Sequence, residues 1–137
     1  MIHNLQQNIK YWLDSSKKDL DVAQDLFRSK HYPQCLFFCH LSLEKLLKGI
    51  ITKTTKKYPP YIHDLQRLAE FAKIDLNSQQ KKCLDQIFTF NIAGRYADAK
   101  FEFYKKYNKK EYAQRYLKIT KSLLLWLKKE FQKNKPR

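Results

Sequence analysis

Apolar residues recur at intervals of three and four along much of the chain, which is the spacing of one face of an α-helix. These stripes predict amphipathic helices over about residues 5–29, 62–72, 78–94 and 109–131. Between residues 35 and 47 the apolar positions fall on nearly every side instead. A helix that is apolar all round is buried, because a surface helix keeps a polar face toward water. The pattern therefore predicts a central helix over about residues 31–51, with the others packed around it.

Short polar sequences mark where several of these helices begin. Asp64 lies near the start of the short segment at 62–72, where its carboxylate can cap the first turn. Asn77 is followed three residues later by Gln80, which is the spacing of a capping box. Asn108 and Glu111 repeat this spacing ahead of the last helix. These pairs predict the starts of the fourth and last helices.

Proline and glycine positions predict other boundaries. Pro33 stands where a first-turn proline is tolerated, at the start of the central helix. Gly49 lies near the predicted end of that helix, and residues 52–61 are polar, basic and broken by prolines, which predicts a loop. Gly94 is expected to end the fourth helix. Residues 94–110 are aromatic and basic without clean periodicity, and predict either an irregular connection or a short helix.

Two glycines and four prolines in 137 residues leave little material for strands and tight hairpins. We therefore expect an all-α fold, an antiparallel up-and-down helical bundle of four longer helices plus one short helix. A chain of this length is expected to form a single domain over residues 1–137, with a frayed basic tail at about 132–137. No run of about 18 uncharged apolar residues predicts a membrane span.

The cysteines are expected to be reduced and structural. Three of them, in a chain without an evident export signal, favour a cytoplasmic location. Cys35 and Cys39 lie one helical turn apart with His31 and His40 nearby, which superficially resembles a metal site. Metal-binding cysteines usually come as close pairs in loops, whereas these stand among phenylalanines and are expected to pack as apolar residues. Cys83, on another apolar stripe, is interpreted in the same way, and no metal or cofactor is expected.

The net charge of +15 is concentrated in one part of the chain. Residues 1–29 hold four basic and four acidic residues, and the acidic ones are expected to face solvent beside the lysines. Residues 100–137 hold 13 basic and three acidic residues, a net of +10. Such an excess favours a polyanionic partner, nucleic acid first. A solvated lysine-rich surface without a specific partner remains the alternative.

A histidine beside an aspartate follows two prolines in the segment 59–65. In the structural interpretation, which we favour, Asp64 caps the third helix and His63 packs or hydrogen-bonds at the turn. In the functional interpretation, His63 stands at the rim of a basic cleft.

The exit of the fourth helix offers a second candidate site. Arg95 either pairs with Asp98 or a neighbouring carboxylate, or binds a phosphate. In the second case four nearby aromatic residues offer stacking surfaces for a single strand: Tyr96, Phe101, Tyr104 and Tyr107. Aromatic residues are equally common in the core of a helical bundle, so both interpretations stay open.

Taken together in order, several short motifs resemble the HEPN domain family (higher eukaryotes and prokaryotes nucleotide-binding). The motifs are Tyr11-Trp12-Leu13, Asp19-Leu20-Asp21-Val22-Ala23, Tyr32-Pro33, Leu43-Glu44-Lys45-Leu46-Leu47-Lys48, His63-Asp64-Leu65 and Arg95-Tyr96. The last stands where the family often has arginine-tyrosine-proline, although Ala97 replaces the proline here. The resemblance covers nearly the whole chain.

This resemblance implies an antiparallel bundle that is usually a homodimer. Prokaryotic members are often encoded beside a minimal nucleotidyltransferase, with which they form toxin–antitoxin-like pairs. Many members are metal-independent ribonucleases that use an Arg-x4-6-His motif, and others have lost it. The partners implied for this chain are therefore a second copy, a nucleotidyltransferase, and a nucleotide or RNA.

The chain departs from the ribonuclease motif. Counted from Arg95, the positions for the histidine hold other residues: Lys100, Phe101 and Glu102. Lysine is a poor general base near neutral pH because it is protonated there. The resemblance therefore implies binding of a nucleotide or RNA, without the usual ribonuclease chemistry.

The residues expected to bind the nucleotide or RNA follow from these two segments: Arg95, Tyr96, Asp98, Lys100, Tyr104, Lys105 and His63. An alternative is a metal-independent ribonuclease toxin that uses Arg95 with His63 as a non-standard base. Whether the chain is an enzyme, and then a ribonuclease, stays open at this point.

Overall fold

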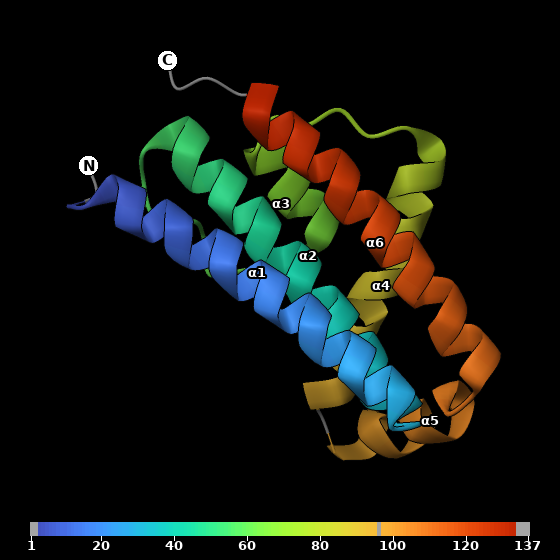
Figure 1. The fold of residues 1–137 in the computed structure, drawn as a ribbon. Helices are drawn as coiled ribbons and strands as arrows, with labels where there is room; N and C mark the ends of the chain where they lie inside the picture. The colour runs from blue at the N-terminus through green and yellow to red at the C-terminus, as the bar shows by residue number, and fades with distance from the viewer. Residues whose placement is uncertain (1–2, 96, 134–137) are drawn as a thin grey trace.

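The computed structural model describes the backbone of residues 3–95 and 97–133. It also describes the side chains of these residues, except those of residues 92–100. Within these residues the chain forms helices and no strand, as Figure 1 shows. The helices are α1 (Leu5–Arg28), α2 (Tyr32–Thr55), α3 (Leu65–Phe71), α4 (Ser78–Arg95), α5 (Ala97–Tyr107) and α6 (Lys110–Lys133). The predicted all-α bundle is confirmed, and the open question about residues 94–110 is decided in favour of a helix, α5.

Helices α1 and α2 run antiparallel across a three-residue turn and lie against each other along most of their length (Figure 1). Gly49 permits this close approach, because a Cβ there would lie 3.2 Å from Cβ of Trp12. Gly49 lies well inside α2 and does not mark its end. The helix continues to Thr55 and stops at Lys56, which adopts a left-handed conformation with φ of 59°. The predicted loop is therefore shorter than expected at its start.

Polar contacts also join α1 to α2, contrary to one expectation. Asp19 is only 8% exposed and forms an ion pair with Lys45 of α2, with 2.7 Å between Oδ2 and Nζ. Ser16 donates a hydrogen bond to the backbone carbonyl of Ser42 at 2.6 Å. The expectation that the acidic residues of α1 all face solvent is wrong for Asp19, because the neighbouring helix supplies a cation beside it.

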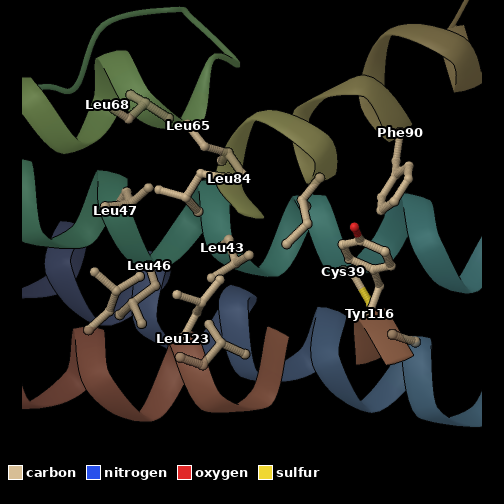
Figure 2. Close-up of a cluster of buried hydrophobic side chains, with 14 of the residues drawn as sticks. Cys39, Leu43, Leu46, Leu47, Leu65, Leu68, Leu84, Phe90, Tyr116 and Leu123 are labelled. Carbon is tan, nitrogen blue, oxygen red and sulfur yellow. The ribbon is translucent and has the colours of Figure 1, made fainter. Parts of the chain in front are cut away.

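Helix α2 is the core of the bundle, as the pattern of apolar residues predicted. Figure 2 shows Leu43, Leu46 and Leu47 between side chains of the surrounding helices. The residues around them include Leu65 and Leu68 of α3, Leu84 of α4 and Leu123 of α6, while Phe90 of α4 and Tyr116 of α6 lie beside Cys39. Cys35 and Cys39 are fully buried in this core, and Cys83 packs against it. Their interpretation as packing residues is confirmed.

Two of the three predicted caps are present. The Asp64 carboxylate accepts hydrogen bonds from the backbone N–H groups of Gln66 and Arg67, at 3.1 and 3.3 Å. Asn77 and Gln80 form a capping box, in which each side chain accepts from the other residue's backbone N–H, at 2.8 and 2.9 Å. These bonds satisfy amide groups that have no partner inside the helix.

Three other predicted boundaries are displaced. Helix α4 continues through Gly94 to Arg95. Helix α6 begins at Lys110, one residue too late for Asn108 to cap it, and the Asn108 N–H instead donates to the carbonyl of Tyr104 at the end of α5. Helix α6 also includes residues 132 and 133 of the predicted tail, whose remainder lies outside the described residues.

An aromatic cluster joins the ends of α4, α5 and α6. Its rings are those of Phe90, Phe103, Tyr107, Tyr112 and Tyr116, with centroids of contacting pairs 4.7–6.1 Å apart. Tyr107 is only 9% exposed. The hypothesis that Tyr107 offers a stacking surface is therefore wrong, because its ring is used in the core.

Two further features bear on function. Among the described residues, no group of three or more histidine, cysteine, aspartate or glutamate side chains is arranged to hold a metal ion. In the same part of the chain, none of the helices combines the length and the apolar character needed to cross a membrane.

Candidate functional site

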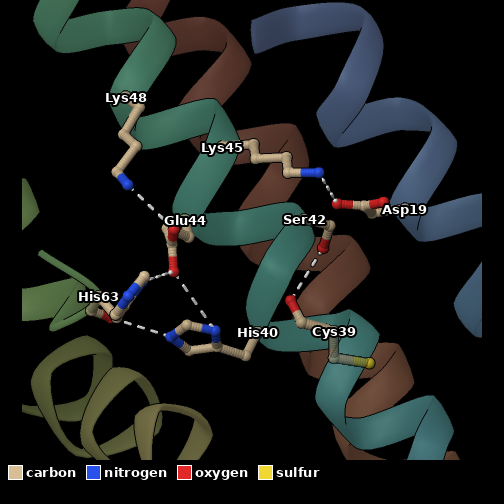
Figure 3. A network of polar contacts seen from close by, with 8 residues as sticks. All are labelled: Asp19, Cys39, His40, Ser42, Glu44, Lys45, Lys48 and His63. Carbon is tan, nitrogen blue, oxygen red and sulfur yellow. Dashed lines mark hydrogen bonds and ion pairs between the residues drawn. The ribbon is translucent and has the colours of Figure 1, made fainter. Parts of the chain in front are cut away.

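The first candidate is a buried polar network on the side of α2 that faces α3 (Figure 3). His40, Glu44 and Lys48 follow one another at intervals of four, so they share one face of α2. His63 enters from the segment before α3, whose direction is set by the Asp64 cap. We call these four residues the Glu44 network.

The polar contacts of the Glu44 network centre on one carboxylate. Lys48 Nζ lies 3.0 Å from Glu44 Oε2, and His63 Nδ1 lies 3.0 Å from Oε1. His40 Nε2 donates to the backbone carbonyl of His63 at 2.9 Å, and its Nδ1 lies 3.7 Å from Oε1. The predicted hydrogen bonding of His63 at the turn is confirmed.

The protonation of the Glu44 network follows from its geometry. Glu44 is only 5% exposed, and this burial alone would raise its pKa. The positive charges of His40 and Lys48, with hydrogen bonds from Lys48 and His63, outweigh burial and lower the pKa of Glu44 below its ordinary value. Glu44 is therefore an anion at neutral pH and accepts a hydrogen bond from His63 Nδ1–H.

This arrangement orients the imidazole of His63. With Nδ1–H donated to Glu44, a neutral ring carries its lone pair on Nε2. The His63 side chain keeps 42% of its surface exposed. A carboxylate that fixes the tautomer of a partly exposed histidine is the arrangement that general bases use.

The second candidate is a surface cavity of about 200 Å³ at the beginning of α2. It is lined by Lys30, His31, Pro33, Gln34, Tyr104 and Asn108. We call it the Tyr104 cavity. It joins the turn between α1 and α2 to the end of α5, two parts of the chain about 70 residues apart.

The local fold of the turn positions the basic side chains of the Tyr104 cavity. Lys30 adopts a left-handed conformation with φ of 66°, which ends α1. The His31 N–H then donates to the carbonyl of Leu26 at 2.8 Å, and that of Lys30 donates to Phe27 at 3.0 Å. The side chains of Lys30 and His31 are both exposed. The turn is thus held by its backbone, and its side chains face solvent.

The Tyr104 cavity combines groups that suit a nucleotide. The ammonium of Lys30 attracts phosphate, the ring of Tyr104 can contact a base, and the Asn108 amide can donate and accept hydrogen bonds. Lys105 and Lys106 are exposed in the last turn of the same helix as Tyr104. This site is open and carries exposed lysines, whereas the carboxylate of the Glu44 network is buried and paired with Lys48.

Comparison with known proteins adds the family. The family model of the HEPN domain matches residues 9–130. The chain belongs to the HEPN domain family. The crystal structure of TT1696 from Thermus thermophilus is similar, with a TM-score of 0.74 over 88% of this chain and 96% of that chain. At 18% identity this likeness shows a shared fold. No curated protein matches the chain.

The predicted site residues of this HEPN chain fall in three places. Arg95 is the last residue of α4, Asp98 and Lys100 lie on α5, and the side chains of all three lie outside the described residues. Tyr96 also lies outside them. Tyr104 lines the Tyr104 cavity, and its neighbour Lys105 is exposed.

His63 lies apart from the other predicted residues. Glu44, its partner, is ten residues further along α2 than Gln34 of the Tyr104 cavity, about 15 Å along the helix axis. Phe88 of α4 contacts the His40 ring, with centroids 6.0 Å apart, and Arg95 follows Phe88 by seven residues, about 10 Å of helix. His63 therefore joins the Glu44 network and not the Tyr104 cavity.

Sequence reasoning did not identify His40, Glu44 and Lys48 as partners of His63. The available signal was their spacing of four inside an apolar helix. Buried ionisable groups are costly unless they pair with one another, so such a spacing indicates mutual contacts. Lys30 was not identified as a candidate, and His31 was considered only beside Cys35 and Cys39. Nothing in the local sequence indicates that the end of α5 packs beside them.

Proposed function

We propose that this HEPN protein binds a nucleotide or RNA at the Tyr104 cavity and along α5. The observation that carries the proposal is the cavity itself, where a tyrosine ring lies beside two exposed basic side chains, Lys30 and His31. Arg95, Tyr96, Asp98, Lys100 and Lys105 extend the site in this proposal. The basic excess of residues 100–137 supports it, because counterion release makes lysine-rich surfaces bind phosphate chains.

The proposal includes protein partners. HEPN membership supports a homodimer and a minimal nucleotidyltransferase partner, acting together in the cytoplasm as a toxin–antitoxin-like pair. The net charge of +15 also favours acidic partners, because negative charges on a partner would offset the repulsion among the positive charges of this chain. The absence of a histidine after Arg95 in the Arg-x4-6-His pattern favours binding over cleavage by the usual family chemistry.

One specific observation favours a second candidate, a metal-independent ribonuclease toxin. The hydrogen bond of His63 Nδ1 to the ionised Glu44, at 3.0 Å, prepares His63 Nε2 to accept a proton. In this candidate His63 takes the proton of a ribose hydroxyl while Arg95 neutralises the adjacent phosphate. The separation of His63 from the Tyr104 cavity counts against one shared site, so binding is the preferred function.

One experiment distinguishes the two candidates. Purified protein is incubated with end-labelled single-stranded RNA in excess chelator, and the RNA is examined by filter binding and on a denaturing gel. Wild type, Arg95→Ala, Tyr104→Ala and His63→Ala are compared with Lys129→Ala, which removes an exposed cation elsewhere on α6.

Each outcome has a defined meaning. Intact RNA, with weaker binding by Arg95→Ala and Tyr104→Ala than by Lys129→Ala, supports the proposed binding site. Cutting by wild type but not by His63→Ala supports the ribonuclease. Equal affinity of all variants with unchanged helicity, or binding that disappears near physiological salt, contradicts the proposal and makes the basic surface incidental.

A further inference from the structure

A long apolar groove lies between α1 and α6, on the side of the bundle where both helices pack on α2. Its volume is about 500 Å³. Leu46 of α2 forms the floor, and the walls are Leu13 and Leu20 of α1 with Leu124, Leu125 and Phe131 of α6. We call this the α1–α6 groove. A groove of this size has the apolar lining typical of binding sites.

A residue of α2 holds one end of the α6 wall in place. Lys53, near the end of α2, donates to the backbone carbonyl of Phe131 at 2.6 Å, and its ammonium lies 4.1 Å from the centre of the Phe131 ring. Leu125 extends outward and keeps 64% of its surface exposed. Leu125 is not an isolated exposed leucine, because it lines the groove together with Leu124 and Phe131. A contiguous apolar surface of this kind favours an interaction site.

Lysines border the groove on both sides. Lys17 lies on α1, and Lys121 and Lys128 lie on α6, with all three side chains exposed. Lys121 and Lys128 are seven residues apart, about 10 Å along one face of the helix. Among the described residues, Asp14 is the one acidic residue that lines the groove. The rim is therefore cationic along its length and not at a single point.

We propose that the α1–α6 groove binds an acidic amphipathic helix of a partner protein. Apolar residues at positions i, i+3, i+4 and i+7 of that helix would enter the groove, and carboxylates on its flanks would pair with Lys17, Lys121 and Lys128. Cations spread over about 10 Å match several carboxylates on a helix better than the one headgroup of an anionic amphiphile.

A second copy of this chain fits the groove poorly. Two grooves placed face to face would bring the lysines of one rim against the same lysines of the other, and like charges in contact are unfavourable. The inference rests on the proposed function only in expecting a protein partner. It assigns that partner a surface whose described lining residues differ from those of the Tyr104 cavity.

The test uses a synthetic peptide of about 18 residues, long enough to populate a helix in isolation. It carries leucines at the i, i+3, i+4 and i+7 positions and glutamates on both flanks, and a matched peptide carries lysines in place of the glutamates. Affinities are measured by fluorescence anisotropy with the full chain. The variants are Leu125→Gln and the double variant Lys121→Glu with Lys128→Glu, and the control is Lys129→Glu.

The proposal predicts that the acidic peptide binds wild type at least about tenfold more tightly than the lysine peptide does. The double variant should reverse this preference, Leu125→Gln should weaken binding of the acidic peptide, and Lys129→Glu should change it least. Lack of binding, no preference between peptides, or an equal effect of Lys129→Glu would overturn the proposal.

Two additional measurements separate this inference from the others. Tyr104→Ala should bind the acidic peptide as wild type does, even if its RNA binding is lost, so failure of the RNA site leaves the groove testable. If wild type is a dimer and Leu125→Gln makes it a monomer in the absence of peptide, the groove is a self-association surface and the proposal is wrong.

Discussion

The Glu44 network and the Tyr104 cavity lie along the same helix and differ in what their polar groups contact. In the first, a buried carboxylate accepts hydrogen bonds from Lys48 and His63 and is close to His40. In the second, Lys30 and His31 extend into solvent beside Tyr104. The first site uses its charges to hold α3 against α2, whereas the second presents its charges outward. The contacts that polar residues make thus distinguish an internally paired network from a proposed ligand site better than the number of polar residues does.

The largest expected effect is on stability, in the Glu44 network. Glu44→Gln keeps the shape of the side chain but leaves buried Lys48 without its counter-charge. Removing one member of a buried ion pair lowers the free energy of unfolding by roughly 3 kcal/mol. Urea denaturation followed by circular dichroism measures the change. Glu70→Gln, on the exposed face of α3, is the matched control and should change stability by less than about 0.5 kcal/mol. A loss in Glu44→Gln no larger than in the control would show that the network is not structural.

The same substitution predicts a pH dependence. The pKa of Glu44 is lower in the folded protein than its ordinary value of 4.5, so the unfolded state binds its proton at higher pH than the folded state does. The stabilisation is complete above that ordinary value and is lost as pH falls through the lower folded pKa. The difference in unfolding free energy between wild type and Glu44→Gln should therefore be constant near neutral pH and decrease below about pH 4.5. A difference that grows on acidification would contradict the assigned charge of Glu44.

An intermediate effect is expected on RNA binding at the Tyr104 cavity. Tyr104→Ala removes the aromatic ring and should weaken binding of a fluorescein-labelled single strand by about 1–3 kcal/mol, or roughly 5- to 150-fold. Tyr104→Phe keeps the ring and should retain most of the affinity. Fluorescence anisotropy titrations compare them. Equal losses in both variants would assign the effect to the hydroxyl, and no loss in either would remove Tyr104 from the site.

The smallest effect is expected for a substitution of Lys30, which should change stability and RNA binding in opposite directions. Lys30 has a positive φ of 66°, which glycine adopts more easily than lysine. Lys30→Gly should therefore raise the unfolding free energy by about 0.5 kcal/mol. It should also reduce the dependence of log affinity for single-stranded RNA on log salt by about 0.7, the value for one lost phosphate contact.

Lys73→Gly is the control for this pair of effects. Lys73 has a φ of 57° after α3 and does not line the Tyr104 cavity. The control should show the same gain in stability and leave the salt dependence unchanged. If both variants change the salt dependence equally, Lys30 makes no specific phosphate contact.

Predictions from the sequence succeeded where the determining forces act within one or two helical turns. The Asn77–Gln80 capping box and the Asp64 cap require only neighbouring residues, and both are present. The prediction failed for Asn108, because the end of α5 competes for the same residue. Asp19 was predicted to face solvent because the pattern of its own helix shows only that the position is polar. Its partner Lys45 belongs to another helix, which that pattern does not reveal.

The sequence by itself determined helices α1–α4 and α6, the burial of α2 and membership of the HEPN family, because periodicity and short ordered motifs depend on local residue types. Only the tertiary structure decided that His63 meets Glu44, that Tyr107 is buried while Tyr104 lines a cavity, and that α1 and α6 leave a lysine-bordered groove. The physical reason is that the environment of a side chain depends on elements distant in sequence. A one-dimensional pattern specifies which face of a helix is apolar, but not which helix will cover it.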